Sequence, residues 1–238
     1  MITIKFKYGF IKFKDIWFPH KYSFRDLFGF TSYKGGNFKN CFGFFKEYKK
    51  SVRHDLTVSS DIIWNNIKKN TRYDINKGKQ ADLLTTFDTI GYMEFINLYN
   101  IFLEKKSLSL QPLNLNRLEK YKNNIKITSI FKDDTWLSIH VYLYTEQYAE
   151  LLYSIVNIDI DHKLTGIANK LLHWNDILYY KNNGISIYDW GGLPMDDSLP
   201  GISKFKLSFG GQEVIYNIYY SPLYKFTFFI KRLKNVFN

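Results

Sequence analysis

Small residues open a helical pattern in the last third of the chain, where a phosphate group could approach the backbone. The segment DHKLTGIANKLLHWNDILYYKNNGISIYDWGG (161–192) contains Lys163-x-x-Gly166-x-Ala168 directly after a strand pattern. Free N–H groups and the helix dipole at a helix amino terminus favour an anion. We therefore predict that Gly166 and Ala168 let a pyrophosphate approach the first turn of a helix at about residues 165–182.

The cysteine and histidine residues suggest few candidates for a metal site or a catalytic base. The single cysteine, Cys41, excludes an intramolecular disulfide and a multi-cysteine metal site. Three histidines show no metal-ligand spacing with any partner, so we predict no metal site: His20, His54 and His162. His140 lies in the middle of a strand pattern, LSIHVYL, and is either a core histidine or a base. His173 lies on the helical pattern and is expected at its surface.

The elements that must position these residues follow from hydrophobic periodicity. Alternating patterns predict consecutive strands at 126–131, 135–145 and 148–159. A further strand at 184–192 comes after the helix at 165–182, and such a crossover makes it parallel to the strand at 148–159. The prediction is an α/β protein of the α+β kind, whose mixed sheet has one parallel strand pair at its centre.

Other patterns complete the organisation of the chain. Four helices are predicted, at 59–79, at 86–106, within 109–124 and at 199–208. Residues 1–58 are predicted to form short aromatic-rich strands and loops, and the chain ends on the apolar and basic segment YKFTFFIKRLKNVF. We therefore expect an amino-terminal extension, 1–58, and a main domain, 59–238.

Composition favours a folded, basic protein. A hydrophobic content of 45% can supply a core, and no apolar stretch reaches the roughly 20 residues that span a bilayer. With no signal-peptide pattern either, we expect a cytosolic protein. Residues 1–53 hold 12 of the Lys and Arg residues against three acidic residues, which leaves +2 of the total charge of +11 for the rest. This basic part is either a solvated surface or a surface for phosphate groups, RNA or an anionic membrane.

Several motifs resemble known families. Lys163-x-x-Gly166-x-Ala168 resembles the Q/R-x-x-G-x-G/A acyl-CoA motif of GNAT-superfamily acyltransferases, with lysine at the first position. Residues 171–192, followed by GISKFKLSFGG (201–211), are similar to the closing part of Fem-type peptidoglycan aminoacyltransferases and their short relatives in bacterial polysaccharide gene clusters. NTRYDINKGK (70–79) and WLSIHVYLYTEQYAELLYS (136–154) extend this similarity, which covers about residues 55–220.

The resemblance implies a GNAT-like fold with a splayed parallel strand pair and a set of site residues. The acyl-CoA thioester would be held by the strand before the helix and by the helix itself: Ser154, Val156, Asn157, Lys163, Thr165, Gly166, Ile167, Ala168 and Asn169. Independently of the resemblance, His140 and Asp189 lie on strands beside the expected thioester, so either could take a proton from an amine. The Fem-type pattern places Lys206 against the donor, and the alternative is a surface lysine on a short helix. Candidates for binding the acceptor are Arg72, Lys77 and Tyr142.

The function implied is N-acyl transfer. The short relatives resemble sugar N-acyltransferases, so the first hypothesis is transfer from a CoA thioester to the amino group of a nucleotide-linked amino sugar, for cell-surface polysaccharide, without a metal or DNA. An aminoacyl-tRNA donor acting on a peptidoglycan precursor is the alternative, and the basic first 53 residues would suit it. A non-enzymatic module that binds RNA or a membrane is a third possibility.

Overall fold

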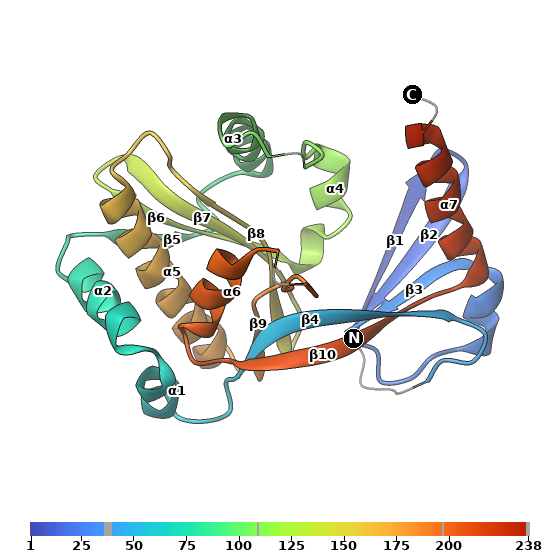
Figure 1. The fold of residues 1–238 in the computed structure, drawn as a ribbon, viewed down its shortest axis with the longest axis horizontal. Coiled ribbons are helices and arrows are strands. Elements are labelled where there is room, and N and C mark those ends of the chain that lie inside the picture. Colours follow the sequence, from blue (N-terminus) through green and yellow to red (C-terminus); the bar gives the residue numbers. More distant parts are fainter. Residues whose placement is uncertain (36–39, 109, 197, 237–238) are drawn as a thin grey trace. The chain divides into compact units, whose positions relative to one another are not determined.

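The computed structural model describes residues 1–35, 40–108, 110–196 and 198–236, and the chain forms two compact units (Figure 1). The amino-terminal unit combines Met1–Ser51 with Val214–Asn238, and the central unit is Val52–Glu213. This division differs from the boundary that the sequence suggested after residue 58, because the last segment of the chain joins the first. Among the described residues, no helix has the length and hydropathy needed to cross a membrane.

The amino-terminal unit is a small sheet that carries one helix. Its strands follow the order β1 (Ile2–Tyr8), β2 (Ile11–Trp17), β3 (Phe30–Lys34) and β10 (Gln212–Tyr220), with the short 3-10 helix η1 (Phe24–Phe28) between β2 and β3. The basic tail of the chain is the helix α7 (Pro222–Val236). Tyr224 of α7 packs edge-on against Phe13 of β2, with ring centroids 5.2 Å apart. An aromatic core therefore joins α7 to the sheet.

The central unit is built on a mixed sheet, as the sequence predicted. Its strand order begins with the end of β4 (Phe45–Asp55), from Val52 on, and continues with β9 (Ile187–Asp189), β8 (Tyr148–Val156), β7 (Thr135–Tyr144), β6 (Ile125–Lys132) and β5 (Leu84–Phe87). Strands β5 to β8 are mutually antiparallel, and β8 and β9 are parallel. The predicted parallel pair at 148–159 and 184–192 is confirmed, although β9 is much shorter than expected.

Helices cover both faces of this sheet. On one face α5 (His162–Asn182) packs against β6 and β7, with α2 (Lys69–Lys79) outside it, while α3 (Tyr92–Lys105) packs against β8 on the other face (Figure 1). The remaining helices of the described chain are short: α1 (Ser60–Asn66), α4 (Leu115–Glu119), the 3-10 helix η2 (Lys122–Asn124) and α6 (Pro200–Leu207). The face of α5 toward the sheet is nearly all buried.

Two predicted helices differ from the structure. The helix expected at 59–79 is two helices, because Ile67 and Lys68 adopt extended ψ values and the N–H of Lys68 donates to the carbonyl of Ser208 instead of continuing the helix. The helix expected at 86–106 begins only at Tyr92, because residues 84–87 pair with β6 as β5. The helix expected within 109–124 is the short α4, and residue 109 lies outside the described residues.

Candidate active site

A cavity opens in the central unit where the parallel strands β8 and β9 separate. Their pairing ends at Glu150 opposite Asp189. Beyond this pair lies a cavity of about 380 Å³, lined by residues from β8, α5, the turn after β9 and α6. Carboxyl ends of strands in such sheets are common ligand sites. A hollow of about 700 Å³ along α3 offers neither lysine nor histidine, so the smaller cavity is the better candidate for catalysis.

Backbone irregularities on both strands shape this cavity. On β8, Tyr153 pairs with Val141 but Leu151 pairs with Tyr142, so Leu152 is an extra residue in a β-bulge. A bulge leaves its extra residue out of the ladder. Just after β9, Gly191 has a φ of +71°, and a Cβ there would lie 1.8 Å from the carbonyl oxygen of Leu151. Only glycine can approach β8 so closely, so the strands are tightly fixed where they part.

Lys206 of α6 is the basic group of the cavity. Its Nζ donates to the carbonyl oxygens of Trp190 and Gly192, both over 2.6 Å. An ammonium has three donors, so one remains for a ligand. Burial lowers the pKa of Lys206 to about 8, against the opposing effect of the Asp189 and Glu150 carboxylates. The structure therefore places the sequence-predicted Lys206 in the lining of the cavity, with one N–H group available to a ligand.

Asp189, the second predicted catalytic residue, lies behind the cavity rather than in its lining. It is fully buried, and its Oδ2 accepts from Nε of Arg53 over 2.6 Å. Its Oδ1 accepts from the N–H of Gly191 over 2.9 Å. Both carboxylate oxygens are thus engaged in holding β4 and the end of β9, which is a structural arrangement and not that of a base facing a substrate.

His140, the other predicted base, is also enclosed. Its side chain is 0% exposed, and it does not line the cavity. Its Nδ1 lies 2.7 Å from Oδ2 of Asp176, and its Nε2 lies 2.9 Å from Oδ1 of Asn169. Asn169 does line the cavity. His140 therefore contacts residues of the lining from behind, through its hydrogen bond to Asn169 and its stacking on the ring of His173, as a core histidine would.

His173, which the sequence suggested for the surface, is the imidazole that lines the cavity. It is buried between the sheet and α6, with 1% of its surface exposed. Its Nδ1 lies 3.1 Å from the hydroxyl of Tyr188, and its ring packs on Trp190 with centroids 4.4 Å apart. The expectation of an exposed His173 was wrong because Tyr188 of β9 and Trp190, just after β9, supply partners that a helical pattern alone does not reveal.

A metal ion is one possible ligand of this histidine cluster. His140, His173 and Asp176 place ligand atoms within 4.8 Å of one another. The two imidazole rings, however, stack with centroids 4.0 Å apart and an interplanar angle of 28°. Ring nitrogens bind metals in the ring plane, so stacked rings aim their lone pairs side by side rather than at one tetrahedral ion. The cluster fits a hydrogen-bond network better than a metal centre.

The predicted phosphate-binding turn differs from the structure. The helix α5 begins at His162, not near residue 165, and Oδ2 of Asp161 accepts from the N–H of Leu164 over 2.9 Å. Gly166 therefore lies inside the helix, where the ladder uses its N–H group. A carboxylate caps the helix end that a pyrophosphate was expected to occupy.

The other residues of the predicted turn serve the helix and its packing. The hydroxyl of Thr165 donates to the carbonyls of Asp161 and His162. Ala168 is completely buried in the core, and Ile167 packs against Gly78 of α2. Lys163 is exposed, and a Cβ on Gly166 would meet no atom within 4 Å. Of the residues predicted for this turn, these two therefore leave space in which a ligand could bind.

The predicted residues of the strand before α5 divide between the cavity and the sheet. Ser154 and Asn169 line the cavity. Val156 pairs with Ser138 of β7. The N–H of Asn157 donates to the carbonyl of Leu137, near the start of β7, over 2.9 Å. The part of β8 that faces the cavity is Leu151–Ser154, earlier in the chain than the sequence suggested.

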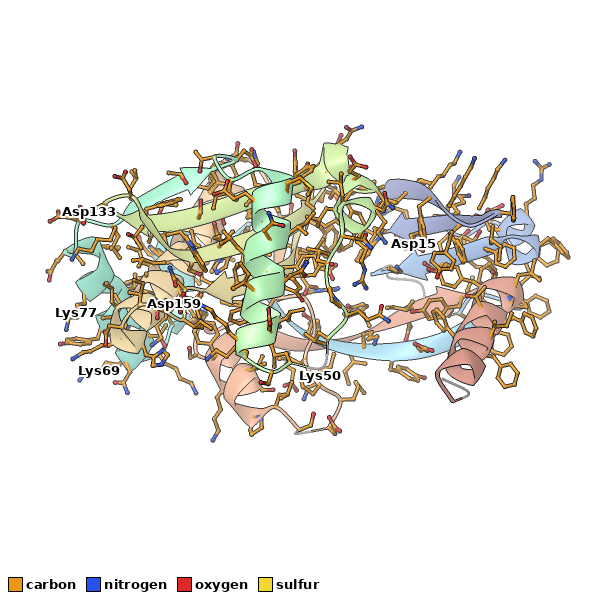
Figure 2. The ribbon with its side chains drawn as sticks, turned by 90° about the horizontal axis from the view of Figure 1, so that it is seen from above. Asp15, Lys50, Lys69, Lys77, Asp133 and Asp159 are labelled. Atoms are coloured by element: carbon orange, nitrogen blue, oxygen red, sulfur yellow. The ribbon has the colours of Figure 1, made fainter. Side chains whose placement is uncertain are left out.

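The residues predicted to bind the acceptor do not converge on this cavity. Arg72 and Lys77 are on α2, and Lys77 projects outward from the central unit (Figure 2). Tyr142 is fully buried and donates its hydroxyl to Oδ2 of Asp176 over 2.7 Å, so it belongs to the network behind the cavity. The prediction that Tyr142 touches the acceptor was therefore wrong.

Comparisons with known proteins show the kind of fold. FemX superposes with a TM-score of 0.59 at 11% identity, over 74% of this chain and 63% of its own length. The carboxyl-terminal domain of a protein assigned as a lysylphosphatidylglycerol synthetase, from Agrobacterium fabrum, gives a TM-score of 0.55 at 11% identity, over 83% of this chain and 69% of that domain. L-PGS from Bacillus licheniformis gives 0.57 at 12% identity, over 92% and 80%.

No family model and no curated sequence matches the chain. The chain spans less than two thirds of the FemX structure, and all three identities are low. The structural neighbours, together with the antiparallel strands β6 to β8, the crossover through α5 and the parallel β9, show a mixed α/β fold similar to that of FemX. The predicted fold class is confirmed.

Proposed function

We propose that the protein transfers an acyl group from an activated donor to a primary amine in the cavity between β8 and β9. The observation that carries this proposal is the position of Lys206, a cationic donor anchored on two carbonyls at the point where the strands part. Acyl transfer needs donors aimed at the developing oxyanion and a held carbonyl. Lys206 of α6 would supply such a donor, and the cavity beside it would hold the carbonyl.

The carbonyl of the donor would lie between Lys206 and the bulge at Leu152. A lysine ammonium with two bonds made has its third N–H free for the carbonyl oxygen. The bulge frees backbone donors of β8 on the opposite side. Negative charge that develops on the oxygen would therefore meet a cation and a backbone dipole.

The first candidate for the reaction joins an acyl-CoA thioester and the amino group of a nucleotide-linked amino sugar, as in polysaccharide synthesis. The open face at Lys163 and Gly166 supports a CoA phosphate at the start of α5. The carboxylate of Asp161 would repel this phosphate, but its exposed side chain can rotate away from the helix end at a cost of about 1 kcal/mol. Arg72 and Lys77 would hold the sugar diphosphate only from the outer side of α2.

The second candidate uses an aminoacyl-tRNA as donor and a peptidoglycan precursor as acceptor. The carboxylate of Asp161 at the start of α5 favours it, because this donor needs no pyrophosphate at that turn. The excess of basic residues in the first 53 positions also suits a nucleic acid. The resemblance of the fold to FemX adds support.

Thiol release and tRNA deacylation in the presence of amines test the proposal. With the first candidate, purified protein releases thiol from acyl-CoA when a dTDP- or UDP-linked amino sugar is present, and not with the free sugar. With the second, it consumes charged tRNA instead. Lys206→Met should reduce either rate at least tenfold, whereas Lys204→Met, on the exposed side of the same helix, should not. A protein that binds RNA or vesicles but transfers nothing from either donor is a binding module, and the proposal fails.

A further inference from the structure

We propose that His173 takes the proton of the attacking amine at its Nε2 and that the hydroxyls of Tyr188 and Tyr142 set its tautomer by connecting its Nδ1 to Asp176. This inference rests on the proposed acyl transfer and adds its proton acceptor. It concerns a residue that lines the cavity, whereas His140 and Asp189 lie behind it. The argument begins from the direction of three hydrogen bonds.

The first bond has a fixed direction because a carboxylate only accepts. The hydroxyl of Tyr142 donates to Oδ2 of Asp176 over 2.7 Å. A hydroxyl has one hydrogen, so the Tyr142 oxygen can only accept from its next partner. That partner is the hydroxyl of Tyr188, 2.8 Å away. Tyr188 therefore donates its hydrogen to Tyr142.

The same reasoning fixes the tautomer of the histidine. With its hydrogen given to Tyr142, the Tyr188 oxygen can only accept from Nδ1 of His173, which lies 3.1 Å away. Nδ1 therefore carries the hydrogen, and in a neutral imidazole Nε2 then holds a lone pair. Nε2 is the ring nitrogen left for the cavity that His173 lines. An amine bound there would find a proton acceptor already oriented.

The surroundings keep His173 neutral before the reaction. Four groups face it from other elements: His140 on β7, Tyr188 on β9, Lys206 on α6 and His54 on β4. Burial, and then the electrostatic effect of His140, Lys206 and His54, holds the pKa of His173 well below its ordinary value. Burial raises the pKa of both tyrosines well above the usual range, so the hydroxyl chain stays protonated.

The step balances in atoms and charge. The amine nitrogen forms a bond to the donor carbonyl, whose oxygen becomes negative beside Lys206. Nε2 of His173 then accepts the N–H proton of the resulting ammonium, and its new positive charge is stabilised through the chain to the Asp176 carboxylate. The carbonyl re-forms, the bond to the leaving thiolate or ribose oxygen breaks, and the leaving atom takes the proton from Nε2. An amide and a thiol, or an amide and a free tRNA end, are the products.

The resting state can be tested without any activity. Nitrogen-15 NMR of histidine-labelled protein, assigned with His173→Asn, should show His173 neutral, with its hydrogen on Nδ1, from pH 5 to 8. In Tyr188→Phe the oxygen that fixes the tautomer is gone, and the Nδ1–H signal should shift or give way to the other tautomer. An Nε2–H form in the unaltered protein, or titration near pH 6.5, overturns the proposal whatever reaction the protein catalyses.

The kinetic test uses the same variants with whichever donor proves active. A general base typically contributes about 10²- to 10⁴-fold, so His173→Asn should lower kcat at least 100-fold with little change in the donor KM. Tyr188→Phe should lower kcat about tenfold at an unchanged KM. Tyr180→Phe is the matched control, because this tyrosine is equally buried but its hydroxyl has no partner within the described structure.

The outcomes separate the two proposals. Loss of rate in His173→Asn and Tyr188→Phe, but not in Tyr180→Phe, supports the relay. Full rates in folded His173→Asn protein overturn it while the acyl transfer stands. Equal losses of kcat in Tyr188→Phe and Tyr180→Phe would show that both tyrosines act only through packing, and this result would also overturn the relay. If the unaltered protein transfers no acyl group, the proposed function fails, and the NMR tautomer still decides whether a neutral acceptor faces the cavity.

Discussion

The Nζ of Lys206 lies 2.6 Å from the carbonyl oxygen of Trp190, and this bond gives the cavity a cation whose charge depends on pH. Because burial lowers its pKa to about 8, the ammonium loses its proton as pH rises through that value. A neutral amine stabilises an oxyanion poorly. We therefore expect the rate of acyl transfer at saturating substrate to fall by about tenfold per pH unit above pH 8.

Lys206→Arg separates this effect from the titration of the substrate amine. A guanidinium stays protonated throughout the range, so the decline above pH 8 should disappear even though the absolute rate is lower. The free amine of the acceptor increases with pH in both proteins and cancels in the ratio of their rates. A ratio that stays constant from pH 7 to 9.5 would show that Lys206 does not carry the pH dependence.

The start of α5 should distinguish the two candidate donors. Asp161→Asn preserves the helix cap but removes the negative charge, because asparagine caps about as well as aspartate. If a CoA pyrophosphate binds at this turn, the acyl-CoA KM should fall several-fold. Gly166→Val, whose added Cβ meets open space, should raise it at least tenfold, or about 1.4 kcal/mol. Donor kinetics that neither substitution changes would place the donor phosphates elsewhere and favour the tRNA.

Much of the central sheet could be predicted from local patterns. The alternation from residue 126 to 156 predicted the antiparallel strands β6 to β8, and the length of the crossover through α5 predicted which pair is parallel. The start of α5 could also have been found, because aspartate at position 161 is a strong capping residue. The predicted start at about residue 165 was too late because it was based on the small residue Gly166.

The candidate site was only partly predictable, because its decisive partners are distant in sequence. His173 and Asp176 are polar residues on a helix, which normally indicates an exposed face. They can be buried because Tyr142 and Tyr188, on two different strands, supply hydrogen-bond partners. Arg53 likewise neutralises Asp189 from 136 positions away. The pairing of such residues depends on the sheet order, which no local pattern encodes.

The buried ion pair between Arg53 and Asp189 should be important for stability. The side chain of Asp189 is 1% exposed and that of Arg53 is 15% exposed. Arg53→Met leaves a buried carboxylate without its cation, which we expect to lower the free energy of unfolding by roughly 3–5 kcal/mol. Lys105→Met is the matched control, since its pair with Asp159 is 42% and 67% exposed and should contribute below about 1 kcal/mol. Urea unfolding at pH 7 measures both, and equal losses would contradict the assignment.

The close approach of Gly191 to Leu151 should be essential for the fold of the site. Gly191 and Gly184 both have left-handed backbones, with φ values of +71° and +78°. Alanine at either position meets the left-handed penalty of about 1–2 kcal/mol. At Gly184 nothing lies within 4 Å of the added Cβ, but at Gly191 the Cβ would lie 1.8 Å from the Leu151 carbonyl oxygen and would force β9 away from β8. In urea unfolding, we expect Gly184→Ala to lower the free energy of unfolding only by that penalty, and Gly191→Ala to lower it by more than about 4 kcal/mol.

The same two substitutions should differ in transfer activity, because Asp189 and Lys206 are both bonded to the turn at Gly191. Any Gly191→Ala protein that folds should lose transfer activity, whereas Gly184→Ala should keep it. Similar stabilities of the two variants would mean that the strands are free to separate, and the cavity would then not be a rigid site.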